Sequence, residues 1–178
     1  IPKIVSSAED LALIQVGLTT CKHLLWLVYS ASARGLPSLA LVPDIHDDHQ
    51  PLMEPYGIST STCTDSSSNN GFVLAALSYN YQVDAQYDLH LFSYVPSTWS
   101  WTCTRRRLAV DYGWTRKPHR VYPDKVIALG DGLLGWVDLW EGILICDVKD
   151  PKATARFVPM PTLLPGNQDL YSKDYSSA

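Results

Sequence analysis

The chain has 178 residues, of which 46% are hydrophobic and 18% charged, and its formal net charge at pH 7 is −4. This composition can bury a core and is not that of a disordered chain, and the length suits one compact domain or part of a larger one. The negative charge argues against nucleic acid as a partner. No apolar run approaches the roughly 18 residues of a membrane-spanning helix, so we expect no membrane partner.

The first group of predicted strands covers residues 4–43. Leu11–Leu18 has a strand-like composition, although Ser7–Asp10 also permits a short capped helix there. Leu24–Ser30 is apolar throughout and of strand length. Ser38–Pro43 indicates a further strand that ends in proline. A polar loop follows this group.

The second group of predicted strands covers residues 56–108. Ile58–Thr62 and Phe72–Ser78 indicate two strands, and Trp99–Arg107 indicates another through its alternation. Tyr87–Ser93 also alternates. Its two faces carry Tyr87, Leu89 and Leu91 on one side and Asp88 and His90 on the other.

The third group covers residues 124–161. Lys125–Leu129 begins it, and the apolar runs Leu133–Leu139 and Ile143–Val148 indicate two inner strands. Arg156–Pro161 carries two prolines at period two, which suits the outer edge of a sheet. We expect a single buried core here that contains Trp136, Val137, Leu139, Ile143 and Ile145.

Three strand groups without helical periodicity predict an all-β fold of antiparallel meander units, at 4–43, 56–108 and 124–161. Such units suggest blades of a partial β-propeller, and the alternative is an open β-sandwich. We expect a single β domain over residues 1–164, or part of a larger propeller-like domain, and a flexible tail over 165–178. Three units do not close a propeller, so we expect the isolated chain to self-associate.

A family resemblance rests on segments that occur in a fixed order along the chain. They are LVYSASARGLPSLALVPD at 27–44, FVLAALS and YDLHLFS within 72–93, TWSWTCTRRRL at 98–108, WVDLWEGILICDV at 136–148 and RFVPMP at 156–161. These segments resemble a plant family, best represented in grasses, called domain of unknown function 1618. That family is similar to the propeller-like domains attached to F-box proteins. The resemblance implies a propeller-like fold and carries no known chemistry.

Glycines at Gly130, Gly132 and Gly135 form the pattern G-x-G-x-x-G. In a dinucleotide-binding fold this pattern follows a strand and opens a helix. Here the following residues are strand-like and broken at Gly142, so a tight hairpin is the better interpretation. We expect no bound cofactor.

A second candidate site is the loop segment DIHDDH. Carboxylates and imidazoles at this density are suited to a divalent metal, but the spacing matches no metal motif and we interpret the segment as a solvated acidic loop. Its candidate ligands are Asp44, His46, Asp47, Asp48 and His49.

No nucleophile motif is visible, and no metal-binding CxxC pair occurs. Asp138 and Glu141 are candidate paired carboxylates, but we expect Asp138 to bond turn amides instead. Three isolated histidines are more typical of strand and loop positions than of a catalytic base: His23, His90 and His119.

A basic cluster near several tryptophans is a candidate phosphate or RNA surface. Arginines at strand ends more often solvate an edge and deter edge pairing. The basic residues are Arg105, Arg106, Arg107, Arg116, Lys117 and Arg120, and the tryptophans are Trp99, Trp101 and Trp114.

Cys21, Cys63, Cys103 and Cys146 form no redox motif, and their use fits a reducing, intracellular location, cytoplasmic or nuclear. Two function classes remain. A non-catalytic protein-interaction domain, with loops on a rigid β scaffold, is favoured by the missing active-site motifs. The alternative is an enzyme whose site residues lie on scattered loops.

Overall fold

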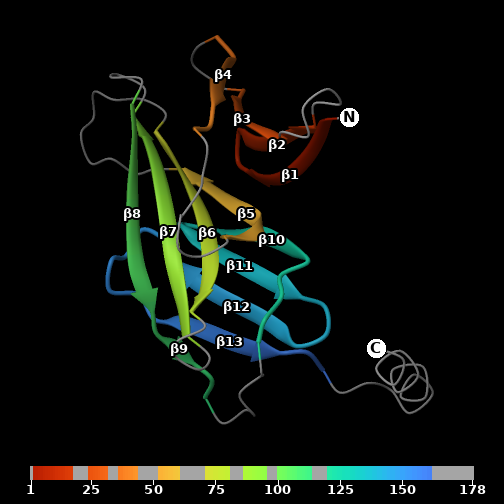
Figure 1. Ribbon diagram of the computed structural model, residues 1–178, viewed down its shortest axis with the longest axis vertical. Coiled ribbons are helices and arrows are strands. Elements are labelled where there is room, and N and C mark those ends of the chain that lie inside the picture. The colour runs from red at the N-terminus through yellow and green to blue at the C-terminus, as the bar shows by residue number, and fades with distance from the viewer. Residues whose placement is uncertain are drawn as a thin grey trace, which may run out of the picture.

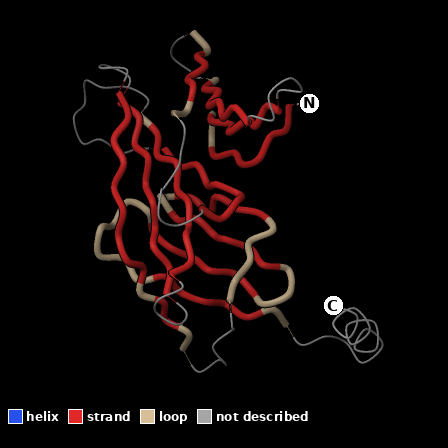
Figure 2. The backbone as a smooth tube through the Cα atoms, viewed as in Figure 1, coloured by secondary structure: helices blue, strands red, loops and turns tan. Residues whose placement is uncertain are grey.

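Thirteen β-strands and no helix make up the secondary structure of the residues described here (Figure 2). The prediction of an all-β fold with antiparallel sheets is therefore confirmed for this part of the chain. None of these residues forms a helix that is long and apolar enough to cross a membrane. The computed structural model describes residues 2–17, 24–31, 36–43, 52–60, 71–80, 86–95, 100–113 and 120–161.

The first sheet is an antiparallel meander with the order β1-β2-β3-β4 (Figure 1). Its third and fourth strands begin where the sequence predicted, whereas β1 was not predicted. The capped-helix alternative at Ser7–Asp10 is wrong, because Ser7 belongs to β1 and Glu9 and Asp10 form the turn that follows. The strands are β1 (Pro2–Ala8), β2 (Leu11–Gly17), β3 (Leu24–Ser30) and β4 (Ser38–Leu41).

The second sheet has the order β5-β6-β7-β8 and is also antiparallel throughout. Tyr87 and Leu89 of β7 enter one hydrophobic cluster, but Asp88 and His90 on the opposite face of the strand are buried as well, so neither face is exposed to solvent there. The strands are β5 (Leu52–Thr60), β6 (Phe72–Asn80), β7 (Gln86–Val95) and β8 (Ser100–Leu108).

The third sheet has the order β10-β11-β12-β13-β9, in which β9 (Val110–Asp111) pairs in parallel with β13. The predicted edge position of β13 is correct only in part, because β9 covers Ala155 and Arg156. The remaining strands are β10 (Lys125–Gly130), β11 (Leu133–Asp138), β12 (Gly142–Asp147) and β13 (Ala155–Pro159).

The second sheet lies between the other two and buries apolar side chains on both faces. One face packs against the first sheet, where Ile58 and Leu74 meet Leu13 and Trp26 in one cluster. The opposite face packs against the third sheet, in a second cluster of buried residues. Figure 1 shows the second sheet, in yellow and green, in front of the third, in cyan and blue, with the first sheet at the top of the view. The largest side chains of the second cluster are Leu77, Tyr87, Leu89, Leu134, Trp136 and Leu144.

The first strands of the three sheets lie together. β1 contacts β5 and β10, and β5 contacts β10 as well. At this junction Gly57 allows close approach, because a Cβ atom there would lie 2.7 Å from Leu134 Cδ1 and 2.8 Å from Val126 Cγ1. The sheets are therefore joined at their first strands and pack face to face beyond them.

The predicted single core around β11 and β12 is wrong in composition. Trp136 is fully buried in the cluster between the second and third sheets, but Leu139 is 57% exposed. Val137 is buried outside that cluster, and Ile143 and Ile145 are only half-buried. The physical reason is the alternation of β12, which turns Leu144 and Cys146 toward the second sheet and the two isoleucines away from it.

Candidate functional site

The turn between β11 and β12 exposes two large apolar side chains. β11 ends at Asp138, and the next two residues, Leu139 and Trp140, are 57% and 53% exposed. Gly142 then begins β12 at φ 152°, and a Cβ atom there would lie within 2.3 Å of the Val158 carbonyl oxygen. Glycine is therefore required for the chain to return beside β13.

The carboxylate of Asp138 holds this turn in place. The backbone N–H groups of Trp140 and Glu141 donate to Asp138 Oδ1 at 2.8 and 3.0 Å, and the N–H of Tyr122 donates to Oδ2 at 2.7 Å. The Asp138 side chain is itself buried. The prediction that Asp138 bonds turn amides is confirmed, and charge-assisted bonds of this kind are about twice as strong as neutral ones.

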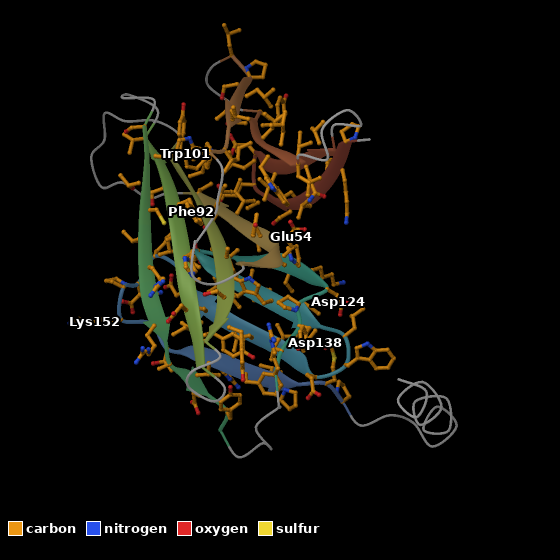
Figure 3. All side chains as sticks on the ribbon, in the orientation of Figure 1. Glu54, Phe92, Trp101, Asp124, Asp138 and Lys152 are labelled. Atoms are coloured by element: carbon orange, nitrogen blue, oxygen red, sulfur yellow. The ribbon has the colours of Figure 1, made fainter. Side chains whose placement is uncertain are left out.

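A second carboxylate fixes the same turn from its outer side. Asp124 Oδ2 accepts the N–H of Leu139 at 2.9 Å, while the N–H of Asp124 donates to the Val137 carbonyl at 2.8 Å. The N–H of Met160 donates to the Glu141 carbonyl at 3.0 Å. Figure 3 places Asp124 and Asp138 near each other at the same end of the third sheet.

Tyr122 adds a third exposed apolar side chain beside this turn, with 60% of its surface accessible. The Arg120 guanidinium lies 4.4 Å from the Tyr122 ring centroid and also 4.4 Å from that of Tyr79. This cation–π pair orients the Tyr122 ring. We call the exposed group of Tyr122, Leu139 and Trp140 the aromatic turn.

A polar cavity of about 190 Å³ lies where the three sheets meet. Glu9 comes from the β1–β2 turn, Ser59 and Thr60 from the end of β5, and Asp131 from the β10–β11 turn. Thr60 Oγ1 donates to Glu9 Oε1 at 3.5 Å. The cavity lining therefore contains two carboxylate residues, Glu9 and Asp131, and three hydroxyl residues: Ser7, Ser59 and Thr60.

The predicted hairpin at the glycine-rich segment is confirmed. Gly130, Asp131 and Gly132 have φ values of 92°, 50° and 90° and form the turn between β10 and β11. A strand rather than a helix follows, so the backbone that a dinucleotide pyrophosphate requires is absent from this segment. Gly135 lies within β11.

His90 lies close to a serine that the sequence analysis did not connect with it. Ser78 Oγ and His90 Nε2 are joined by a hydrogen bond of 2.8 Å, and both side chains are buried. Asp88, two residues from His90 on the same face, pairs with Arg105 at 3.9 Å. Ser78 has no exposed surface, so its hydroxyl is not available to a substrate. We interpret these residues as a polar part of the sheet packing.

The arginines of β8 have separate environments. Arg106 points toward the third sheet, where Nη2 donates to the Asp147 carbonyl at 3.1 Å and Nη1 to the Ala153 carbonyl at 3.5 Å. Arg105 pairs with Asp88, and Arg107 is exposed. Trp101 packs on Phe72 and Tyr94. Arg106 and Trp101 therefore contribute to packing, whereas Arg105 and Arg107 are exposed.

Several candidate residues lie outside the described residues, and the DIHDDH loop is among them. Among the described residues, no three histidines, cysteines or acidic residues form a metal-binding group. The other candidates outside are His23, His119, Cys21, Cys63, Trp99, Trp114, Arg116 and Lys117.

The aromatic turn was not predicted, because the strand was expected to extend to Leu139. The available signal was the spacing of Asp138 and Gly142, since an aspartate that bonds amides two and three residues ahead begins a turn. Tyr122 gave no signal, because it lies 16 residues before Asp138 and reaches it only in the folded chain.

The comparison with known protein families matches a segment that contains Leu139 and Trp140 of the aromatic turn, but not Tyr122. Residues 136–177 match the family model described as "Protein of unknown function (DUF1618)". No curated protein and no solved structure matches the chain. The match begins at Trp136, two residues before Asp138, and supports the predicted DUF1618 family over this part of the chain.

Proposed function

We propose that the chain is a non-catalytic protein-interaction domain that binds a partner through its aromatic turn. One observation carries this proposal: Tyr122, Leu139 and Trp140 are each more than half exposed and lie around a single buried carboxylate. Large apolar side chains that are exposed on an ordered turn lose little conformational entropy on binding, because the backbone that presents them is already fixed.

The chemistry of the aromatic turn matches that of protein interfaces. Tryptophan, tyrosine and arginine are the residue types that dominate interface energetics, and Arg120 lies against the Tyr122 ring. Tyrosine and tryptophan combine a large apolar area with few rotatable bonds. The partner surface that fits is therefore an apolar pocket or groove.

We also propose a propeller-like arrangement of the three sheets within the all-β fold. Three meander sheets that meet at their first strands support a propeller-like arrangement, in which each sheet is one blade. The similarity to F-box-associated propeller-like domains, in a plant protein, remains part of this proposal. A substrate-recruiting role, in which the domain holds a protein for a ligase, follows from that similarity.

The test is affinity purification of the tagged chain from plant tissue, with quantitative mass spectrometry of the retained proteins. The Leu139→Ala/Trp140→Ala double variant is compared with the parent. We expect at least a tenfold loss of specific partners, because truncation of interface hot spots typically costs about 2 kcal/mol or more. A Leu24→Ala/Leu36→Ala double variant is the matched control, since it removes exposed leucines elsewhere.

Melting curves of all three proteins are recorded first, so that a loss of binding is separated from a loss of fold. Retention of the same proteins at the same level by the parent and the Leu139→Ala/Trp140→Ala variant contradicts the proposal. A loss that the control shares also contradicts it, because such a loss does not depend on the aromatic turn.

The polar cavity supports a second candidate function, an enzyme with site residues on scattered loops. Glu9 and Asp131 bring two carboxylates from separate turns to one cavity of about 190 Å³. Carboxylates in a cavity are suited to general acid and base roles. Turnover of a small molecule that Asp131→Asn abolishes, without a change in melting temperature, supports this alternative; turnover that is unchanged in Asp131→Asn contradicts it.

A further inference from the structure

The strand β8 forms a long and regular edge of the second sheet. It pairs with β7 over its whole length, from Val95↔Ser100 to Tyr87↔Leu108, without a shift of register. No described strand pairs with its other side, and Figure 1 shows β8 as the outermost strand of this sheet. β8 therefore presents nine consecutive residues along one sheet edge.

The other edge strands in the described part of the chain are irregular or short. β1, β5 and β10 each have a register shift against their neighbour, and β5 also contains Pro55. β4 has four residues and β9 has two, and the part of β13 beyond β9 ends at Pro159. Bulges, prolines and short strands are devices that prevent a sheet edge from pairing with another chain. β8 has none of the three.

The middle of β8 is accessible from both faces of the sheet. Residues 102–105 are four successive exposed residues, and successive side chains of a strand point to opposite faces. Neither the first nor the third sheet therefore covers β8 at these positions. A strand added beside them has room on both of its faces.

Arginines give one half of this edge a positive charge. Arg106 turns toward the third sheet and donates to two carbonyl oxygens there. Arg105 and Arg107 lie two residues apart and therefore share the opposite face of β8, where both are exposed. Asp88 pairs with Arg105 at 3.9 Å and is the buried acid on this face. One carboxylate thus faces two guanidinium groups.

This charge selects what can pair with the edge. Opposite charges on neighbouring strands stabilise a sheet, and like charges directly opposite each other destabilise it. The arginines therefore deter a basic strand and attract an acidic one. The other half of β8, residues 100–104, carries no charged side chain and leaves the edge open there.

We propose that β8 binds an extended segment of a partner protein as an added strand, and that this segment carries acidic residues at alternate positions. Backbone hydrogen bonds to the edge hold such a segment, and alternation places its carboxylates on the face that carries Arg105 and Arg107. A second copy of this chain fits less well, because its own β8 brings the same three arginines. The site goes beyond the binding role of the aromatic turn and does not depend on it.

The first test is fluorescence anisotropy with a labelled peptide of the same nine-residue length as β8, in which glutamate alternates with threonine. The matched probe has lysine in place of every glutamate. We expect the acidic peptide to bind about tenfold more tightly than the lysine peptide, because two cross-strand pairs change from opposite to like charge. Equal affinities of the two peptides, or no binding of the acidic peptide, overturn the proposal.

Two variants test whether the acidic peptide binds at β8. Thr104→Glu adds a negative charge at an exposed position, and Arg107→Ala removes an exposed positive charge. We expect each to weaken binding of the acidic peptide by about threefold to fivefold. Leu36→Glu, at a loop residue that is 90% exposed, adds the same charge away from β8 and binds as the parent does.

Thermal melting confirms the fold of each variant, and Thr102→Glu replaces Thr104→Glu if that variant does not fold. A loss in Leu36→Glu as large as that in Thr104→Glu overturns the proposal, because the peptide then responds to the charge of the whole chain.

Amide hydrogen exchange, followed by NMR, separates an added strand from attraction between side chains alone. In an edge strand every second backbone N–H points away from the neighbouring strand. We expect the acidic peptide to slow exchange at alternate amides of residues 100–108. Binding without this protection overturns the added strand. A parent that is dimeric in size-exclusion chromatography, and becomes monomeric in Thr104→Glu, shows that a second copy occupies the edge and overturns the partner segment.

Discussion

At the scale of single residues, Asp138 connects the fold to the proposed binding surface. Its buried carboxylate accepts three backbone N–H groups, two from the turn and one from Tyr122. The position of Asp138 in the sequence indicated a turn. The structure adds the hydrogen bond from the Tyr122 N–H, which lies 16 residues earlier in the chain. The aromatic turn therefore depends on one side chain that does not itself belong to the exposed surface.

We predict that Asp138→Ala lowers the free energy of unfolding by about 2–4 kcal/mol, because it leaves three partly buried N–H groups without their acceptor. Urea denaturation measures the change. Asp150→Ala is the matched control: this exposed aspartate accepts one N–H, from Lys152 at 2.8 Å, and its loss costs about 1 kcal/mol or less. Equal losses in the two variants contradict the role assigned to Asp138.

Cys146 gives the chain a predicted dependence on alkaline pH. Burial raises the pKa of the Cys146 thiol to about 11, and the nearby Arg106 guanidinium opposes this shift. Because the folded pKa lies above the unfolded value of 9.0, the folded state retains this proton, and stability is lost as pH rises from 9 toward 11.

We predict that the parent loses about 1–2 kcal/mol more stability between pH 8 and pH 10.5 than Cys146→Ala does, since the variant lacks this ionisation. Urea titrations at the two pH values give the difference. Buried Tyr87, whose pKa is also raised by burial, ionises in both proteins and cancels in the comparison. Parallel losses in the parent and the variant contradict the assignment.

At the scale of elements, the sequence predicted where the strands lie better than it predicted which side chains of each strand face the core. The runs at β3, β6, β7, β11 and β12 identified strands because short apolar or alternating runs have few other structures available. The faces of β12 were not predictable from its four successive apolar residues, because such a run carries no alternation. β1 and β9 were not predicted, because they are recognised as strands only from the strands with which they pair. For β9, that partner lies more than 40 residues later in the chain.

The two faces of β12 yield a direct prediction. Leu144 is fully buried against the second sheet, whereas Ile145 is half-buried on the outer face. We expect Leu144→Asp to unfold the chain, because an unpaired buried carboxylate costs several kcal/mol, comparable to the stability of a domain. Ile145→Asp remains folded with a smaller loss. Circular dichroism melts separate the two, and unfolding of Ile145→Asp alone contradicts the assigned faces.

At the scale of the whole molecule, the second sheet organises the chain, because both of its faces are covered and its first strand contacts those of the other two sheets. The sequence predicted three groups of strands but not the order in which their sheets stack, since that order depends on contacts between distant residues. The aromatic turn and the polar cavity follow from the same stacking. The cavity in particular combines turns from all three sheets.

The central claim is that the sheets pack against one another where their first strands meet, and Gly57 tests it most directly. A Cβ atom there would lie 2.7 Å from Leu134 Cδ1 and 2.8 Å from Val126 Cγ1, whereas at Gly17 the nearest atom would be Leu24 Cδ2 at 3.8 Å. The measurement is urea denaturation of Gly57→Ala beside Gly17→Ala.

We predict that Gly57→Ala lowers the free energy of unfolding by about 1–3 kcal/mol, the usual cost of overpacking a core. Gly17→Ala leaves it unchanged or raises it by up to about 1 kcal/mol, because alanine restricts the unfolded chain. A Gly57→Ala protein as stable as the parent would mean that β5 does not press against the third sheet, and would contradict the account.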